Sequence, residues 1–175
     1  MTEKRINDEM KNNNEMKNNN FVRPDLAVYL SGSPCDGLDT YAYARQTGIL
    51  SAGMDTTGIA FDYFDASCAE DFEIDAEFLT INRPGTYLIT YIITVPQAAS
   101  VDAIFRLMTE NRPVAGTTVR VRHTPAADDA AYMAQTVVRI NERTTLTLTP
   151  DKNVDFKAND EEITLASLTI LKLHS

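Results

Sequence analysis

The stretch Gly85–Val95, GTYLITYIITV, decides the fold because it reads as a β-strand that is apolar on both faces. One face carries the odd-numbered residues Tyr87, Ile89, Tyr91, Ile93 and Val95. The opposite face carries Leu88 and Ile92 beside the methyl groups of two threonines. A strand in a two-sheet sandwich needs only one apolar face, because its other face meets water. We therefore expect a partner subunit to cover the second face, since obligate interfaces resemble a domain core cut in half.

Turn chemistry sets the ends of this strand and of a later pair. The sequence NRPG at 82–85 predicts a type II turn, in which proline presets φ at the first central position and glycine supplies a positive φ at the second. Residues 141–142, Asn-Glu, separate two alternating runs and predict a hairpin. In the second run Leu146 and Leu148 are expected to face inward and the threonines outward.

Short strand-like runs separated by turn residues continue to the end of the chain. No segment has a convincing helical pattern, so the sequence predicts an all-β sandwich or jelly roll. Ten strands are expected near 41–50, 58–64, 78–81, 87–95, 103–109, 117–122, 132–140, 144–148, 154–157 and 163–173.

Length and charge limit the classes of function. The 175 residues fit one jelly-roll domain over 41–175, preceded by a linker or extra edge strand at 21–40 and a flexible Asn-rich tail at 1–20. In that tail the hexapeptide EMKNNN occurs twice, at 9–14 and 15–20. The net charge of −9 opposes binding to nucleic acid and to anionic membranes. Arg120 and Arg122 alternate with valines and are interpreted as the solvated face of a strand.

No ordinary secretory signal and no apolar run long enough to span a bilayer is found in the sequence, so membrane insertion is not expected. Localisation stays open, with a bacterial spore or cell surface reached by another route as one option. Cys35 and Cys68 are too few to form a disulfide framework. They are interpreted as small, partly buried hydrophobic residues, while a single disulfide between them remains open.

Several motifs in this order resemble the jelly rolls of the tumour necrosis factor and complement C1q superfamily. The residues that carry the likeness, over about 41–173, are FLTINRPGTYLITYIITV, AIFRLMTENRPVAGT, TTLTLTPDKNVDF and ASLTILKL. The likeness is greatest to the carboxy-terminal domains of the bacterial collagen-like exosporium (BclA-like) glycoproteins. It implies a ten-stranded jelly roll that assembles as a homotrimer. The Gly-x-y collagen stalk of that group is absent from residues 1–40, so the likeness implies the fold more than stalked display.

Catalytic chemistry finds little support. Only His123 and His174 are present, whereas a jelly-roll metalloenzyme needs about three imidazoles and a carboxylate. The sequence has no Gly-x-Ser-x-Gly motif, no glycine-rich phosphate loop and no cysteine with an evident basic partner. His123 is expected at the surface. We therefore predict that the protein is not an enzyme and has no resident cofactor.

A group of carboxylates forms the one candidate cation site. Calcium takes six to eight oxygen ligands, and an Asp-rich loop can supply them, although the EF-hand spacing is absent. A solvated acidic rim and a pair of acid/base groups are the alternatives. The group consists of Asp62, Asp65, Glu70, Asp71, Glu73, Asp75 and Glu77.

These observations favour a homotrimeric surface or structural protein used for display, adhesion or assembly on a spore or cell surface. The alternative is a recognition head that binds a glycan or a surface protein through its loops, with or without calcium. A hydrolase or metalloenzyme is disfavoured by the missing histidines. The residues expected in the core and the trimer contacts are Tyr87, Ile89, Tyr91, Ile93, Leu168, Ile170 and Leu171.

Overall fold

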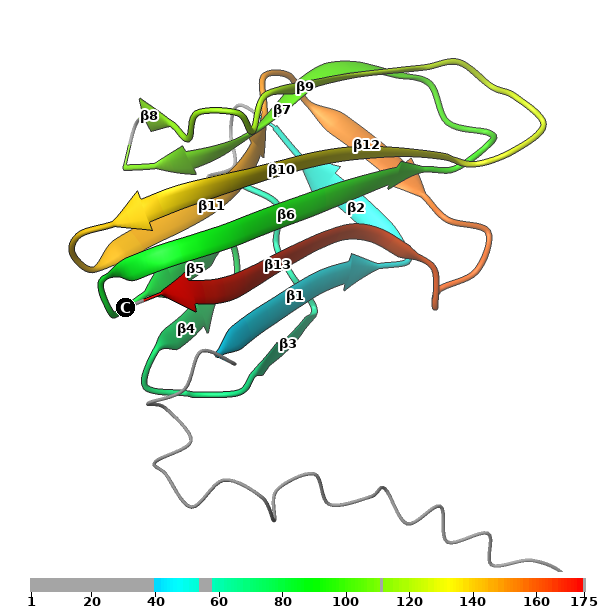
Figure 1. Ribbon diagram of the computed structural model, residues 1–175. Coiled ribbons are helices and arrows are strands. Elements are labelled where there is room, and N and C mark those ends of the chain that lie inside the picture. Colours follow the sequence, from blue (N-terminus) through cyan, green and yellow to red (C-terminus); the bar gives the residue numbers. More distant parts are fainter. Residues whose placement is uncertain (1–39, 54–57, 111, 175) are drawn as a thin grey trace, which may run out of the picture. The chain divides into compact units, whose positions relative to one another are not determined.

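The computed structural model describes residues 40–53, 58–110 and 112–174, which form thirteen β-strands (Figure 1). The tail with its EMKNNN repeats, most of the expected linker, and Cys35 lie outside the described residues. The strands are β1 Tyr41–Thr47, β2 Ile49–Ala52, β3 Tyr63–Ala66, β4 Phe72–Asp75, β5 Phe78–Ile81, β6 Gly85–Val95, β7 Val101–Thr109, β8 Arg112–Pro113, β9 Val119–His123, β10 Ala130–Ile140, β11 Thr144–Pro150, β12 Val154–Lys157 and β13 Thr164–His174.

Two antiparallel sheets make a sandwich. The five-stranded sheet has the order β10-β6-β13-β1-β3, and it faces the viewer in Figure 1. The six-stranded sheet has the order β4-β5-β11-β7-β8, with β9 pairing to β7. A small third sheet pairs β12 with β2. Strands that are consecutive in sequence often lie in different sheets, as a jelly roll requires.

The strand Gly85–Val95 lies at the centre of the core. Its odd-numbered side chains are buried while its even-numbered ones are half-buried, so the two faces of β6 meet different surroundings. β13 contributes Leu168 and Ile170 to the same core, and β11 contributes Leu146 and Leu148, all fully buried. The leucines of β11 therefore face inward as predicted, and its threonines are half-buried.

Three more strands are present than the ten that the sequence predicts. The run at 41–50 divides into β1 and β2 because Gly48 adopts a φ of +66°, a left-handed conformation that interrupts pairing. β8 is a two-residue bridge to β7. The third additional strand, β4, was not predicted because two of its four residues are carboxylates. In its sequence FEID the buried Phe72 and half-buried Ile74 alternate with exposed acids.

The predicted hairpin at residues 141–142 is wrong. β10 pairs with β6 in the five-stranded sheet, whereas β11 pairs with β5 and β7 in the six-stranded sheet. The chain therefore crosses from one layer of the sandwich to the other at 141–143 (Figure 1). Alternation identified both strands correctly, but it carries no information about which sheet each one joins.

The predicted type II turn before β6 is also wrong, because Gly85 does not adopt a positive φ. A glycine stands there for a different reason. A Cβ on Gly85 would lie 2.8 Å from the carbonyl oxygen of His174 and 3.2 Å from the Cε of Lys172. The first residue of β6 thus lets β13 approach more closely than any side chain would allow.

Candidate functional site

The outward face of the five-stranded sheet carries no charge over its central strands. Its centre is formed by β6 and β13, whose nine outward side chains include no charged residue. From the neighbouring β10, Met133, Gln135 and Val137 point the same way, and the exposed Arg139, paired with Thr86, bounds the uncharged area at the end of this strand. We call these twelve positions the uncharged face: Thr86, Leu88, Thr90, Ile92, Thr94, Met133, Gln135, Val137, Ser167, Thr169, Leu171 and Leu173.

Large apolar side chains are exposed on this side of the sandwich. Met133 and Val137 of β10 are 59% and 58% exposed, and Leu171 and Leu173 of β13 are 41% and 44% exposed. Tyr63 of β3, at the far edge of the same sheet, is 46% exposed. Among the described residues only two other large hydrophobic side chains are exposed, and both lie on other sheets. This group of exposed apolar side chains is therefore the candidate interaction surface of the protein.

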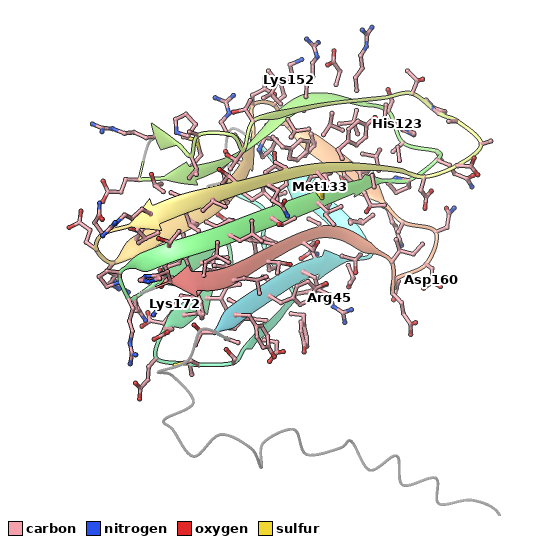
Figure 2. All side chains as sticks on the ribbon, viewed as in Figure 1. Arg45, His123, Met133, Lys152, Asp160 and Lys172 are labelled. Carbon is pink, nitrogen blue, oxygen red and sulfur yellow. The ribbon has the colours of Figure 1, made fainter. Side chains whose placement is uncertain are left out.

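Strand register arranges the exposed groups in rows across the sheet. Val137 pairs with Leu88, which pairs with Leu171 of β13. Met133, labelled in Figure 2, begins a second row: it pairs with Ile92, which pairs with Ser167 of β13, so this row is apolar except for the serine. Between them lies a polar row in which Gln135 Nε2 donates to Thr90 Oγ1 at 3.0 Å.

The edge of this sheet at β1 and β3 carries aromatic and charged groups. The guanidinium of Arg45 lies 4.9 Å from the ring centre of Tyr63, a cation–π distance. Tyr43 and Tyr63 have ring centres 6.3 Å apart. Tyr41 donates its hydroxyl hydrogen to Oδ2 of Asp65 at 3.0 Å, and this hydrogen bond raises the pKa of Tyr41. The uncharged face is thus bordered by polar groups on this side, as interfaces commonly are.

The residues expected in the core and trimer contacts divide between the two sides of the sheet. Most of them are buried within one protomer, between the two sheets: Tyr87, Ile89, Tyr91, Ile93, Leu168 and Ile170. Leu171 lies on the uncharged face. The sequence analysis did not single out Met133 and Val137. The alternating pattern of β10 could have identified them, because both are apolar residues at positions that face solvent.

Two buried phenols connect β6 to the rest of the sandwich. The hydroxyl of Tyr91 donates to the carbonyl oxygens of Thr117 at 2.6 Å and Phe105 at 3.1 Å. Burial raises the pKa of Tyr91 far above its ordinary value. The hydroxyl of Tyr87 donates to the carbonyl oxygen of Arg83 at 2.8 Å, and burial raises the pKa of Tyr87 to about 12. Each phenol gives the backbone of another segment a buried partner, which makes the position of β6 specific.

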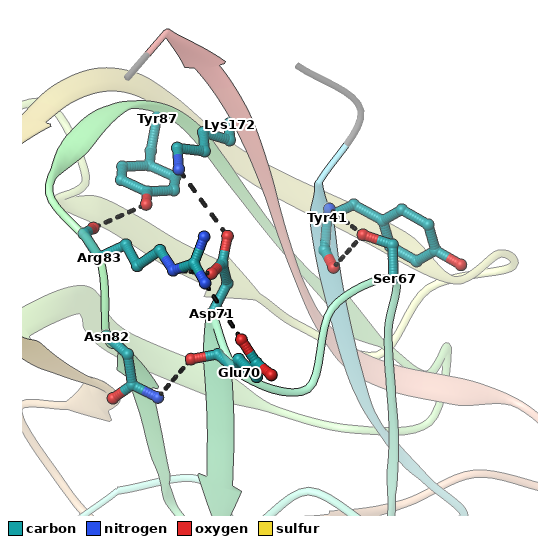
Figure 3. Close-up of polar contacts among 8 residues, drawn as sticks. All are labelled: Tyr41, Ser67, Glu70, Asp71, Asn82, Arg83, Tyr87 and Lys172. Atoms are coloured by element: carbon teal, nitrogen blue, oxygen red, sulfur yellow. Dashed lines mark hydrogen bonds and ion pairs between the residues drawn. The ribbon is translucent and has the colours of Figure 1, made fainter. Parts of the chain in front are cut away.

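A buried ionic cluster lies beneath one end of β6 and β13 (Figure 3). Asp71 is fully buried, and its Oδ1 lies 2.7 Å from Nε of Arg83. Its Oδ2 lies 3.8 Å from Nζ of Lys172, a side chain that is only 6% exposed. Arg83 extends the cluster to the exposed Glu70 at 3.1 Å. A buried carboxylate between two cations joins β13 to the segment before β4.

The other carboxylates of the candidate cation site are dispersed. Asp62 accepts hydrogen bonds from the amide and hydroxyl of Thr47 at 2.8 and 2.6 Å. Glu73 accepts from Asn82 and Arg143, and these contacts lower its pKa. Asp75 is exposed at the end of β4. Within the described ranges, no three His, Cys, Asp or Glu side chains are grouped so that they could hold a metal ion.

The two histidines differ in burial. His123 is 7% exposed, so the expectation that it lies at the surface is wrong, and its Nε2 has no hydrogen-bond partner among the described residues. It points inward because β9 places Val121 and His123 on its buried phase. His174 is exposed at the end of β13.

A shallow pocket of about 300 Å³ lies between the β8–β9 loop and the β10–β11 connection, with Val114 and Ile140 in its lining.

Comparison with known proteins gives a clear answer at the level of fold. No protein-family model and no curated protein matches the chain. Among solved structures, murine APRIL at pH 5.0 aligns with a TM-score of 0.53 and 13% identity over 77% of this chain and 99% of its own. The globular domain of zebrafish complement 1qA aligns with a TM-score of 0.52 and 10% identity over 75% and 93%. Eiger TNF from S. frugiperda aligns with a TM-score of 0.52 and 13% identity over 77% and 93%.

The fold is a TNF- and C1q-like jelly roll. This confirms the predicted fold class and the superfamily-level resemblance in fold, while identities of 10–13% carry no residue roles across. In the described part of the chain, no helix has the length and hydropathy of a membrane span.

Proposed function

We propose that this TNF- and C1q-like jelly roll is a non-enzymatic binding head that works as a homotrimer, with the uncharged face buried between copies. The observation that carries the proposal is the uncharged face itself. In a chain with 23% charged residues, twelve neighbouring outward positions carry no charge, and Met133 and Val137 expose more than half of their surface. Leaving such a surface in water is unfavourable, and burying it against a like surface is favourable.

A second copy of the chain is the occupant that best fits this face. The rows of β10, β6 and β13 offer apolar area and neutral hydroxyl and amide groups, but no charged group within the uncharged face with which to select an ionic ligand. Interfaces of permanent oligomers have this composition, whereas transient partners meet more polar surfaces. The superfamily resemblance noted in the sequence supports the same arrangement, with three copies around an axis.

The binding role follows from what stays outside such a trimer. The six-stranded sheet and its loops would remain in solvent, and the described residues include no group of three His, Cys, Asp or Glu side chains that could hold a metal ion. The resemblance to exosporium-type domains supports display on a spore or cell surface as the setting. The TNF and complement structures of the same fold support recognition of a partner protein as the alternative role.

Light scattering coupled to size-exclusion chromatography tests the assembly. One chain has a mass of 19.4 kDa, so a trimer has a mass of about 58 kDa. We expect the full chain to elute at the trimer mass over a wide range of protein concentration, with or without a calcium chelator. A monomer at micromolar concentration would overturn the proposal, because the uncharged face would then be stable in water.

A further inference from the structure

A cluster of positive side chains lies on the sheet opposite to the uncharged face. β7 and β9 are paired in register, and their buried phases hold residues such as Phe105 and Val121. Their outward phases therefore bring Arg106, Arg120 and Arg122 to one side. Lys152, in the turn between β11 and β12, joins them because its Nζ donates to the carbonyl oxygen of Asp102 at 3.1 Å. We call these four residues the cationic face; Figure 2 labels Lys152 at the edge of the molecule.

The local carboxylates leave much of this positive charge unbalanced. Arg120 donates two hydrogen bonds to Oδ1 of Asp102, from Nε at 3.1 Å and from Nη2 at 2.9 Å. The hydrogen bond from Arg120 is the main cause of a lowered pKa of Asp102, and the charges of Lys152 and Arg122 add to it. Asp151 turns one carboxylate oxygen to the backbone amide of Ile104 at 2.7 Å. Four cations thus face two carboxylates, one already held by a guanidinium and the other by the backbone.

Cross-strand pairing balances only part of the positive charge of the cationic face. Asp102 lies directly opposite Arg122 in the strand register and is ion-paired with Arg120, so one carboxylate serves two guanidinium groups. Arg106 pairs across the sheet with the uncharged Thr149. The clustering also occurs in a chain whose net charge is −9, where carboxylates outnumber cations. A surface on which cations outnumber the nearby carboxylates attracts anionic ligands.

We propose that the cationic face binds an acidic polysaccharide, a chain of sugars that carries sulfate or carboxylate groups. Guanidinium groups match both anions because their planar donors form two parallel hydrogen bonds. The other outward side chains of these strands include Asp102, Ile104 and Met108, with no aromatic ring among them. Single-stranded nucleic acid is held by bases stacked on aromatic side chains, so its recognition would lack a platform here.

The inference goes beyond the trimeric head and does not depend on it. Both strands of the cationic face belong to the six-stranded sheet, whereas the uncharged face belongs to the five-stranded sheet. A single protomer therefore carries a whole site. In a trimer three sites would act together, and their avidity for a long polysaccharide would exceed the affinity of one site.

Calorimetric titration of the full chain with a short dextran sulfate tests the proposal, with neutral dextran of the same length as the blank. We expect heat of binding from the sulfated chain alone, and an affinity that falls roughly 20- to 100-fold between about 50 and about 200 mM NaCl, as three or four ionic contacts require. Replacing Arg106 and Arg122 together by Gln should weaken binding at least tenfold and halve the salt dependence. The short ligand reports on one site, so a failure of trimer formation would not change the result.

A charge-matched control separates the site from general electrostatics. Arg112→Gln with Lys157→Gln removes the same charge from exposed positions of β8 and β12 and should leave the affinity within twofold. Arg122→Glu serves as a second variant, and circular dichroism should show that every variant is folded. Equal binding by neutral dextran, an equal loss in the control, or no binding at about 50 mM NaCl would overturn the proposal. Tighter binding of oligo-dT than of dextran sulfate would overturn the assignment to a polysaccharide.

Discussion

The Nζ of Lys172 and the Oδ2 of Asp71 lie 3.8 Å apart with both side chains buried, so the last strand of the sandwich is joined to the segment before β4 through charge. Removing one member of such a cluster leaves the other buried without compensation. Asp71→Asn should lower the free energy of unfolding by about 3–5 kcal/mol, because Lys172 and Arg83 would both lose their shared carboxylate. Urea denaturation measures the change.

Glu70 provides the matched control for that substitution. It contacts the same Arg83 at 3.1 Å, but its side chain is 76% exposed. Exposed pairs contribute little, so Glu70→Gln should change stability by less than about 1 kcal/mol. Equal effects of the two substitutions would mean that burial does not set the energy of the cluster.

Alkaline pH should weaken the fold through Tyr87. Burial is the main cause that raises the pKa of Tyr87 from 10.0 to about 12, with the charge of Asp71 adding and that of Arg83 opposing. A folded pKa above the unfolded value means that the protonated phenol stabilises the fold fully below about pH 10, and that this stability is lost as the pH rises from about 10 through 12. Tyr87→Phe should make urea midpoints fall less steeply over that interval, and an unchanged slope would contradict the assignment.

The buried hydroxyl of Tyr91 should contribute more to the free energy of unfolding than an exposed hydroxyl does. It gives the carbonyl oxygens of Phe105 and Thr117 a hydrogen bond inside the core. Tyr91→Phe leaves both without that donor and should cost about 1–3 kcal/mol. Tyr132 donates to the carbonyl oxygen of Arg122 at the surface, so Tyr132→Phe should cost less than about 1 kcal/mol. Comparable losses in thermal or urea unfolding would refute the ranking.

Alternation of side chains predicted most of the strands and the inward phase of β6 and β11, because the side-chain period of two is local to each strand. It could not predict that β10 and β11 join different sheets, since that choice depends on contacts between residues distant in sequence. β4 was missed because its exposed acids, Glu73 and Asp75, dominated the composition of the segment.

The candidate sites show the same limit. Burial of His123 on an arginine-rich strand was not predicted, because the phase of β9 depends on the sheet that covers it. The cationic face could be seen from sequence only as Arg120 and Arg122. Arg106 and Lys152 join it through strand pairing and a turn, which bring together residues up to 46 positions apart. The carboxylates at 62–77 are close in sequence, and yet the fold gives them separate partners.

Two glycines should respond differently to the same substitution. Gly85 has no room for a Cβ, because the carbonyl oxygen of His174 would lie 2.8 Å away. Gly48 has a φ of +66°, and the nearest atom to a Cβ there is 3.4 Å away. Asn tolerates the left-handed region, so Gly48→Asn should cost about 1 kcal/mol or less. Gly85→Asn should cost more, about 1–3 kcal/mol, because β13 must shift. The reverse order in thermal unfolding would show that backbone strain outweighs the close approach.

Charge placed on the uncharged face should separate assembly from folding. Val137 is 58% exposed in the protomer, so Val137→Glu leaves the protomer core intact but puts a carboxylate into the interface between copies. Burying an unpaired carboxylate is strongly unfavourable, so the variant should elute as a folded monomer with its β-sheet circular dichroism unchanged. Ile49 is 50% exposed on β2, outside that face, and Ile49→Glu should stay trimeric.

A third substitution completes this set, because it addresses the inner side of the same sheet. Ile93 lies on β6 with no exposed surface, so Ile93→Asp places its carboxylate between the two sheets of one protomer. It should abolish folding, and not merely assembly, and the spectrum should lose its β signal. If Val137→Glu remained trimeric while Ile93→Asp unfolded, the copies would meet through a surface other than the uncharged face. If Ile49→Glu dissociated as readily as Val137→Glu, added charge alone would account for the loss, and the uncharged face would lose its special role.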